Sequence, residues 1–308
     1  MTVSRLRSTS AITNSADYWP NLSAAYSLGN PTWNTYQFIG DGQDSINGQN
    51  YRVHRLELVG GLSAQNSMSS TIAFSKAGYI DFILVAAGGS AGAQNTVGGG
   101  GGGAGGAIIK YNFYVEAASY PCTIGYAQTP NDLPSFNGVN SVFGSEIAIG
   151  GGGGGYASTG YMGRSGGSGG GNAWSSAPTV LGGTGTVGQG NAGGGNLNSN
   201  GTGGGGWASA APYNIFASGR GSDGGDGFGT KFDGTYRVFC AGGAGGGQSG
   251  AGGNGGMVNG VYVGGMGIGN SNGAIPTRPS NPGCGGGATY GGVGGPGSGG
   301  MLLIRYKI

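Results

Sequence analysis

Aromatic and arginine side chains between long glycine runs are the residues of this chain best suited to recognise another molecule. These residues are Tyr156, Tyr161, Arg164, Trp174, Trp207, Tyr213, Phe216 and Arg220. Tyrosine, tryptophan and arginine dominate the hot spots of protein interfaces, and loops on a rigid scaffold often carry recognition. We therefore predict that the group forms a binding surface. The alternative is that the rings cover the ends of glycine segments and shield them from water.

Catalytic and metal-binding side chains do not form a recognisable set in the sequence. Its only histidine is His54, and its three cysteines are Cys122, Cys240 and Cys284. Their spacing matches neither a metal site nor a disulfide framework. No glycine pattern opens a helix followed by the acidic residue that a dinucleotide site requires. We therefore expect a protein that is not an enzyme and needs no cofactor, with a structural role for His54.

The segment 219–223 is weakly similar to a calcium-binding nonapeptide repeat. It occurs once, however, whereas such repeats bind calcium only when they stack. Asp223, Asp226 and Asp233 are more typical of turn residues, because aspartate side chains hydrogen-bond to nearby backbone. We therefore predict no metal site here.

Composition separates this chain from most globular proteins and narrows its partners. Glycine accounts for 81 of 308 residues, charged residues are 8%, and the net charge is +2. The basic residues are scattered, so we expect neither nucleic acid nor a membrane as a partner. The N-terminus lacks the apolar core of a signal peptide, and the longest apolar run, 79–87, is too short to span a bilayer. We expect synthesis in a cytoplasm without membrane insertion.

Apolar segments alternate with the glycine runs and predict short β-strands. The predicted strands lie at 51–59, 71–74, 77–87, 107–115, 120–124, 236–240, 261–263 and 301–308, with two more at 140–149 on either side of Gly144. The last strand is strongly apolar and requires partners. We expect these to be 79–85 and 107–115, in a small sheet at one end of the domain.

The glycine run 241–256 could be a flexible linker, a collagen-like helix or a packed element. Ordering it costs roughly 1–2 kcal/mol per residue. A linker is disfavoured because strands flank the run, apolar residues interrupt the glycine-rich region, and Arg278 is the only charge between 241 and 300. Collagen requires glycine at every third position, and Gln248 and Ser249 break that frame. We favour polyglycine helices in the polyproline-II conformation, with three residues per turn and sideways N–H and C=O groups. A turn at Gln248–Ser249 would give two shorter rods.

Two regions follow from this composition. Residues 1–75 have ordinary composition and predict a separate N-terminal β-rich module for attachment or oligomerisation. Residues 76–308 predict a glycine-rich domain that carries the binding surface. The expected fold is mostly β and irregular, with a small β-sheet and a packed bundle of polyglycine-II helices.

The order of strands and glycine runs over 76–308 resembles the glycine-rich domain of phage tail-fibre and adhesin proteins. The matching motifs are 79–89, 98–109, 120–125, 137–144, 147–151 and 297–306. The chain is also similar to the polyglycine sandwich of T-even-like long-tail-fibre tip adhesins. Similar domains in anaplastic-lymphoma-kinase-type receptors come with signal peptides, membrane spans and a kinase domain, which we do not find in this sequence.

The resemblance implies a receptor-binding protein of a virion tail fibre, made in the host cytoplasm. In that family, loops between glycine motifs contact the bacterial receptor, which would be a surface glycan or an outer-membrane protein. Other virion tail proteins are expected partners, and a homotrimer is one assembly open to the chain. A structural virion component without a receptor is the alternative. A secreted or shed cell-surface binding module is a third, and the missing signal peptide counts against it.

Overall fold

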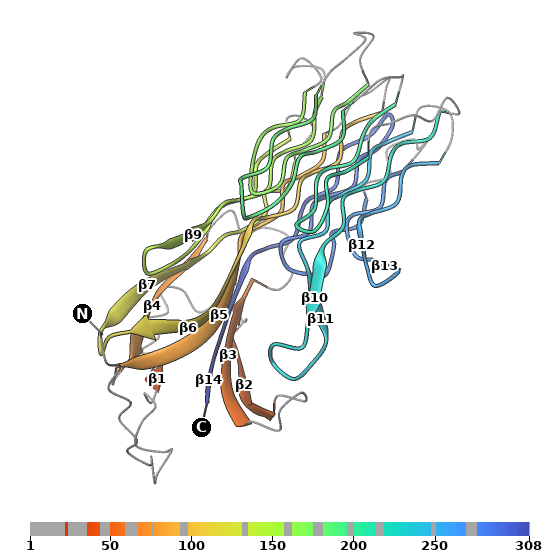
Figure 1. Ribbon diagram of the computed structural model, residues 1–308. Helices are drawn as coiled ribbons and strands as arrows, with labels where there is room; N and C mark the ends of the chain where they lie inside the picture. The colour runs from red at the N-terminus through yellow and green to blue at the C-terminus, as the bar shows by residue number, and fades with distance from the viewer. Residues whose placement is uncertain are drawn as a thin grey trace, which may run out of the picture.

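The computed structural model consists of antiparallel sheets at one end and extended glycine segments that run away from them (Figure 1). Described residues are 22–23, 36–43, 50–58, 67–74, 77–92, 98–130, 135–156, 162–174, 181–195, 200–212, 219–247, 251–268 and 276–307. None of these residues is helical. The fold is therefore β-rich, and the glycine segments account for most of the remainder.

Two five-stranded antiparallel sheets form the sheet end. The first, which we call the β14 sheet, contains in order β2 (Tyr36–Gln43), β3 (Asn50–Glu57), β14 (Met301–Lys307), β5 (Gly78–Val85) and β6 (Ala107–Val115). The second, the β7 sheet, contains β1 (Leu22–Ser23), β4 (Met68–Phe74), β7 (Ser119–Ile124), β8 (Ser141–Phe143) and β9 (Glu146–Ala148). Two hairpins complete the strands, namely β10 (Phe228–Thr230) with β11 (Arg237–Phe239) and β12 (Met257–Val258) with β13 (Val261–Tyr262).

The main hydrophobic core lies between the two sheets. Alternate residues of β14, such as Leu302 and Ile304, share one buried cluster with Ile72, Ile124 and Phe143 of the β7 sheet. Side chains alternate between the two faces of a strand, so the remaining β14 residues must face elsewhere. Packing of the two sheets therefore accounts for one half of the apolar pattern of the last strand.

The opposite face of the β14 sheet is covered by the β10–β11 hairpin and its surroundings. Met301 and Leu303 join a second buried cluster with Phe232 and Phe239. Arg305 extends the same face, with its guanidinium 4.4 Å from the centroid of the Phe232 ring. Because both faces of β14 are buried, its sequence is almost continuously apolar, as expected for a strand with no solvent-exposed face.

Strand pairing confirms one sequence prediction and changes another. β14 pairs with β5, as expected, but residues 107–115, the other expected partner of the last strand, form β6 and pair with β5 instead. The other neighbour of β14 is β3, and β4 pairs with β7. Residues 50–57 and 68–74 were expected in a separate N-terminal module, but they complete both sheets because β14 and β7 each need a second partner. The two regions are therefore continuous in the structure.

Glycine-rich segments outside the sheets lie side by side in what we call the glycine array. It comprises 86–92, 98–106, 149–156, 162–174, 181–195, 200–212, 219–227, 240–247, 251–256, 263–268 and 276–300. Backbone N–H groups of each segment donate to carbonyls of other segments, at 2.7–3.4 Å. The array therefore satisfies its backbone polar groups between segments, as buried peptide groups require.

Segment 98–106 lies inside the array and shows a repeat in its hydrogen bonds. Every third amide donates to the same neighbouring segment. The donor–acceptor pairs are Gly99–Thr289, Gly102–Gly286 and Gly105–Gly283 along one neighbour, Gly100–Gly155, Gly103–Gly152 and Gly106–Ile149 along a second, and Gly101–Thr202 and Ala104–Gly205 along a third. The segment thus bonds to three neighbours in rotation.

Close approach between segments explains why this region is glycine. A Cβ atom on Gly102 would lie 2.1 Å from the carbonyl oxygen of Gly89. A Cβ on Gly103 would lie 2.3 Å from the carbonyl oxygen of Ser168. Neither distance is possible between unbonded atoms, so any larger residue would push the segments apart.

The run 241–256 reverses direction, as the sequence predicted. Gly253 donates its N–H to the carbonyl of Gly245 at 3.0 Å, and Gly256 donates to Gly242 at 2.9 Å. The two halves therefore lie antiparallel. The predicted turn residues, Gln248 and Ser249, lie outside the described residues.

Candidate functional site

The end of the glycine array away from the sheets, which we call the far end, collects the ends of several segments (Figure 1). Gly92 donates its N–H to the carbonyl of Gly100 at 2.8 Å, and Trp174 donates to Gly98 at 3.0 Å. The amide of Gly100 donates to Gly155 at 3.1 Å. The described segments that stop at 92, 156 and 174 therefore stop beside the start of segment 98–106.

Later segments end at the same place. Gly246 donates its N–H to Gly99 at 3.0 Å, and Gly201 donates to Gly246 at 3.1 Å. Gly99 in turn donates to Thr289 at 3.0 Å. These contacts bring the segment ends at 200 and 247, together with Thr289 inside segment 276–300, close to Gly99, so distant parts of the chain meet at the far end.

Three of the eight predicted binding residues border the far end. Tyr156 ends one segment and is 7% exposed, and Trp174 ends another and is half-buried. The guanidinium of Arg220, near the start of a third, pairs with the Asp223 carboxylate at 2.6 Å. Asp223 also accepts a hydrogen bond from the backbone N–H of Asn254 at 2.7 Å. The Arg220 side chain is thereby held against the array.

Arg164 lies just inside the array, two residues after a segment start at 162, whereas Trp207 lies at the opposite end. The backbone of Arg164 is part of the array, since its N–H donates to Gly153 at 2.8 Å. Trp207 lies at the sheet end, where its N–H donates to Cys240 at 2.9 Å and its ring centroid is 4.7 Å from that of Phe228. The structure therefore does not bring Trp207 together with Tyr156, Trp174 and Arg220. Tyr161, Tyr213 and Phe216 lie outside the described residues.

Small polar side chains near the far end form hydrogen bonds with backbone groups of the array, and they were not predicted from the sequence. The Asn172 side-chain oxygen accepts the N–H of Gly163 at 2.8 Å. The Thr202 hydroxyl accepts the N–H of Asn172 at 2.6 Å and donates to the carbonyl of Gly194 at 2.6 Å. Both side chains are fully buried. The signal was a lone hydrogen-bonding residue inside a glycine run, where it can replace a missing backbone partner.

The predicted turn aspartates also bond to backbone. Asp226 accepts the N–H of Met257 at 2.9 Å, and Asp233 accepts the N–H of Thr235 at 3.2 Å. Asp233 also pairs with Arg237. No group of three or more histidine, cysteine, aspartate or glutamate side chains within the described ranges could hold a metal ion.

The three thiols are buried at the sheet end of the molecule. Burial raises the pKa of Cys122 and of Cys284 to about 12, and raises that of Cys240 well above its usual value. Thiolates are the reactive form of cysteine, so these side chains are not nucleophiles at neutral pH. His54 is likewise buried, with its ring nitrogen 3.3 Å from the Tyr306 hydroxyl.

A comparison with known families identifies the type of domain. Residues 63–307 match the profile of the glycine-rich domain. The chain belongs to the glycine-rich domain family. The match begins before β4, which agrees with the pairing of that strand in the β7 sheet. No curated protein matches the sequence of this glycine-rich domain protein. Within its described residues, no helix has the length and apolar character needed to cross a membrane.

Proposed function

We propose that this glycine-rich domain protein is a receptor-binding protein of a virion tail fibre that attaches to the bacterial host surface without catalysis. The gathering of segment ends at the far end is the observation that carries the proposal. Chain stretches that differ in sequence could vary there without disturbing the array, which is how rigid scaffolds commonly present recognition residues. The receptor would be a surface glycan or an outer-membrane protein.

We further propose that the glycine array is a bundle of polyglycine-II helices. Segment 98–106 changes hydrogen-bonding neighbour with every residue and returns to the same neighbour after three. A helix with three residues per turn and no internal hydrogen bonds would have this pattern. Each bond between segments contributes about 1 kcal/mol net, which helps to offset the entropy lost when glycine is ordered.

Attachment to the particle belongs, in this proposal, to the sheet end. β2 and β6 are the outer strands of the β14 sheet in the described residues. β2 and β3 belong to residues 1–75, the region to which we assign attachment. Other virion tail proteins, or two further copies in a homotrimer, would bind here. The location is then the virion tail fibre, after synthesis in the host cytoplasm.

Cell binding by the purified full chain tests the receptor role. Fluorescently labelled protein is added to a panel of bacterial isolates and should label only some of them. Replacing 157–161, 175–180, 196–199 and 213–218 with glycine–serine sequences of equal length should remove the labelling. The segments 162–174 and 200–212 are left intact because they bond within the array.

Two controls make the result interpretable. The variant must keep the melting temperature of the parent protein, and replacing the exposed turn residue Val187 by alanine should leave labelling unchanged. Full labelling after all four replacements would contradict the proposal. So would immunogold labelling of the capsid rather than the tail, which would favour a structural virion component.

A further inference from the structure

A cleft lies on the sheet side of the glycine array, between the β10–β11 and β12–β13 hairpins. Its volume is about 470 Å³, within the range of roughly 300–1,000 Å³ typical of small-molecule sites. Its lining includes the side chains of Asp226, Phe228, Tyr236, Met257 and Asn259. We call it the Tyr236 cleft. None of the residues above that were predicted to bind a receptor lines it.

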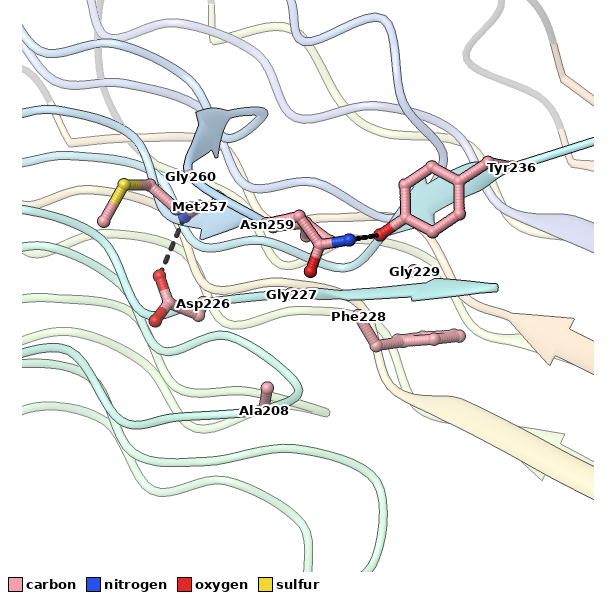
Figure 2. A pocket seen from close by; sticks show the side chains of 10 residues that line it. Ala208, Asp226, Gly227, Phe228, Gly229, Tyr236, Met257, Asn259 and Gly260 are labelled. Carbon is pink, nitrogen blue, oxygen red and sulfur yellow. Dashed lines mark hydrogen bonds between the residues drawn. The ribbon is translucent and has the colours of Figure 1, made fainter. Parts of the chain in front are cut away.

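The polar groups of the Tyr236 cleft follow one another along its length. Figure 2 shows Asp226 near one end, Tyr236 near the other and Asn259 between them. The Asn259 amide donates to the Tyr236 hydroxyl at 2.5 Å, which leaves the hydroxyl proton free to donate to a ligand. One Asp226 oxygen accepts the N–H of Met257 at 2.9 Å. The second carboxylate oxygen makes no hydrogen bond with any other described residue.

The aromatic side chains supply an apolar surface beside these groups. The Tyr236 ring is 44% exposed. The Phe228 ring is held by neighbours, with centroids 4.7 Å from Trp207 and 5.2 Å from Phe239. Gly229 allows Tyr236 to lie over β10, because a Cβ there would be 2.0 Å from the Tyr236 hydroxyl. The rings are therefore positioned before any ligand arrives.

One backbone hydrogen bond and one backbone-to-carboxylate hydrogen bond fix the distance between the walls of the cleft. Gly227 donates its N–H to the carbonyl of Met257 at 3.1 Å, and Met257 donates to Asp226. The hairpin turn that carries Asn259 has left-handed backbone at Asn259 and Gly260, with φ of 50° and 78°. Little reorganisation is needed for binding, and preorganisation of this kind favours affinity.

We propose that the Tyr236 cleft binds a neutral sugar ring. A sugar presents an apolar C–H face, which suits the Tyr236 and Phe228 rings. It also presents hydroxyls that both donate and accept. Asp226 and the Asn259 carbonyl would accept from these hydroxyls, and the Tyr236 hydroxyl would donate to them. Charge excludes acidic ligands, because no lining residue is basic and Asp226 is negative.

This proposal does not depend on the receptor role proposed above, because the cleft is at the sheet end and not at the far end. The two can therefore fail separately. The four replacements at the far end should leave sugar binding in the cleft unchanged, whereas substitutions in the cleft should remove it.

Saturation-transfer NMR on the full chain tests the proposal. The probes are the methyl glycosides of glucose, galactose, mannose and N-acetylglucosamine. At least one should receive saturation, strongest at its ring C–H protons. Asn259→Gly keeps a residue suited to the left-handed backbone and removes the amide, so it should weaken binding about tenfold or more. Asp226→Asn should have a similar effect while its side-chain oxygen still accepts from Met257.

A matched pair of tyrosine variants provides the control. Tyr236→Phe removes a hydroxyl inside the cleft and should weaken binding. Tyr262→Phe removes a similarly exposed hydroxyl outside the cleft, bonded to Asn254 at 3.1 Å, and should not. Each variant is first shown to keep the parent melting temperature. Absence of saturation transfer to all four glycosides, equal binding by Asn259→Gly, or binding of tetramethylammonium in their place would overturn the proposal.

Discussion

At the scale of single residues, the structure separates side chains that pack from side chains that close hydrogen bonds. Asn172 and Thr202 are buried polar groups whose partners are backbone atoms of the array. Unpaired buried polar groups are costly, at about 1–3 kcal/mol each, so these residues stabilise the array where a glycine partner is missing. Cys122 and Cys240 have the opposite role, since they fill apolar space, whereas the buried Cys284 sulfur also accepts the N–H of Ala241 at 3.4 Å.

The cysteines lead to a pH-dependent prediction. Burial holds the folded-state pKa of Cys122 and Cys284 at about 12, above the ordinary value of 9.0. The thiols are therefore protonated at pH 8 and closed to reagents. Ellman's reagent should detect no thiol in the native protein at pH 8, and three per chain in guanidinium chloride.

The same shift sets a direction for stability. These two thiols favour the folded state fully below pH 9 and lose that contribution as the pH rises toward 12. Rapid reaction of native Cys284 at pH 8, located by mass spectrometry, would contradict its burial.

At the scale of elements, different interactions determine the neighbours of apolar strands and of glycine segments. β14 is apolar on both faces and therefore lies in the middle of its sheet, between β3 and β5. A glycine segment has no side chains, and its neighbours are fixed by the close approach of backbones. We therefore expect the array to tolerate very little added volume.

Substitution of two array glycines tests this expectation. A Cβ on Gly246 would lie 2.5 Å from the carbonyl oxygen of Thr289, and one on Gly253 would lie 2.0 Å from that of Ser222. Gly246→Val and Gly253→Val should each cost about 3 kcal/mol or more. The melting temperature should then fall by roughly 6–12 °C, as measured by calorimetry.

A glycine in open space provides the matched control. Gly188 has a φ of 76° and no atom within 4 Å of an added Cβ. Asparagine tolerates left-handed backbone, so Gly188→Asn should melt close to the parent protein. Parent-like melting of both valine variants would show instead that 241–256 is a flexible linker.

Much of the strand pattern could be predicted from the sequence, because apolar runs bounded by glycine leave few alternatives. β6 was predicted at its observed limits, and β8 and β9 were predicted on either side of Gly144. The β12–β13 hairpin was only half predicted, although Asn259–Gly260 between valines is a strong two-residue turn signal. Its omission also hid the Tyr236 cleft.

The neighbours of each glycine segment could not be predicted. Glycine carries no side chain that distinguishes one partner from another, so nothing local indicates that Gly99 meets Thr289. The position of Trp207 was wrongly predicted for the same reason. Its place between glycine runs suggested a loop, but the chain returns to the sheet end at that residue. Only the packed arrangement reveals which interruptions of the glycine pattern lie at the far end.

At the scale of the whole molecule, the sheets and the array form one continuous structure. Array segments continue directly from the strands of the sheets (Figure 1). β5 ends at Val85 and the array begins at Ala86, and the array ends at Gly300, immediately before β14. The array should therefore be as well protected as the sheets, even though it contains little regular secondary structure.

Hydrogen exchange measured by mass spectrometry tests this prediction on the full chain. Peptides that cover 98–106 should exchange as slowly as peptides that cover β5, because their amides are buried and bonded on all sides. Peptides from the exposed turn around Val187 provide the comparison and should exchange fast. Exchange of 98–106 within seconds would contradict an ordered array.

The neighbours of segment 98–106 have a consequence for the order of events during folding. Its partners lie at 149–155, 202–205 and 283–289, so the ribosome makes this inner segment long before most of the chain that surrounds it. Contacts between distant parts of a chain slow folding. The segment must therefore stay solvated until residues 283–289 have emerged, and its third set of hydrogen bonds can form only then.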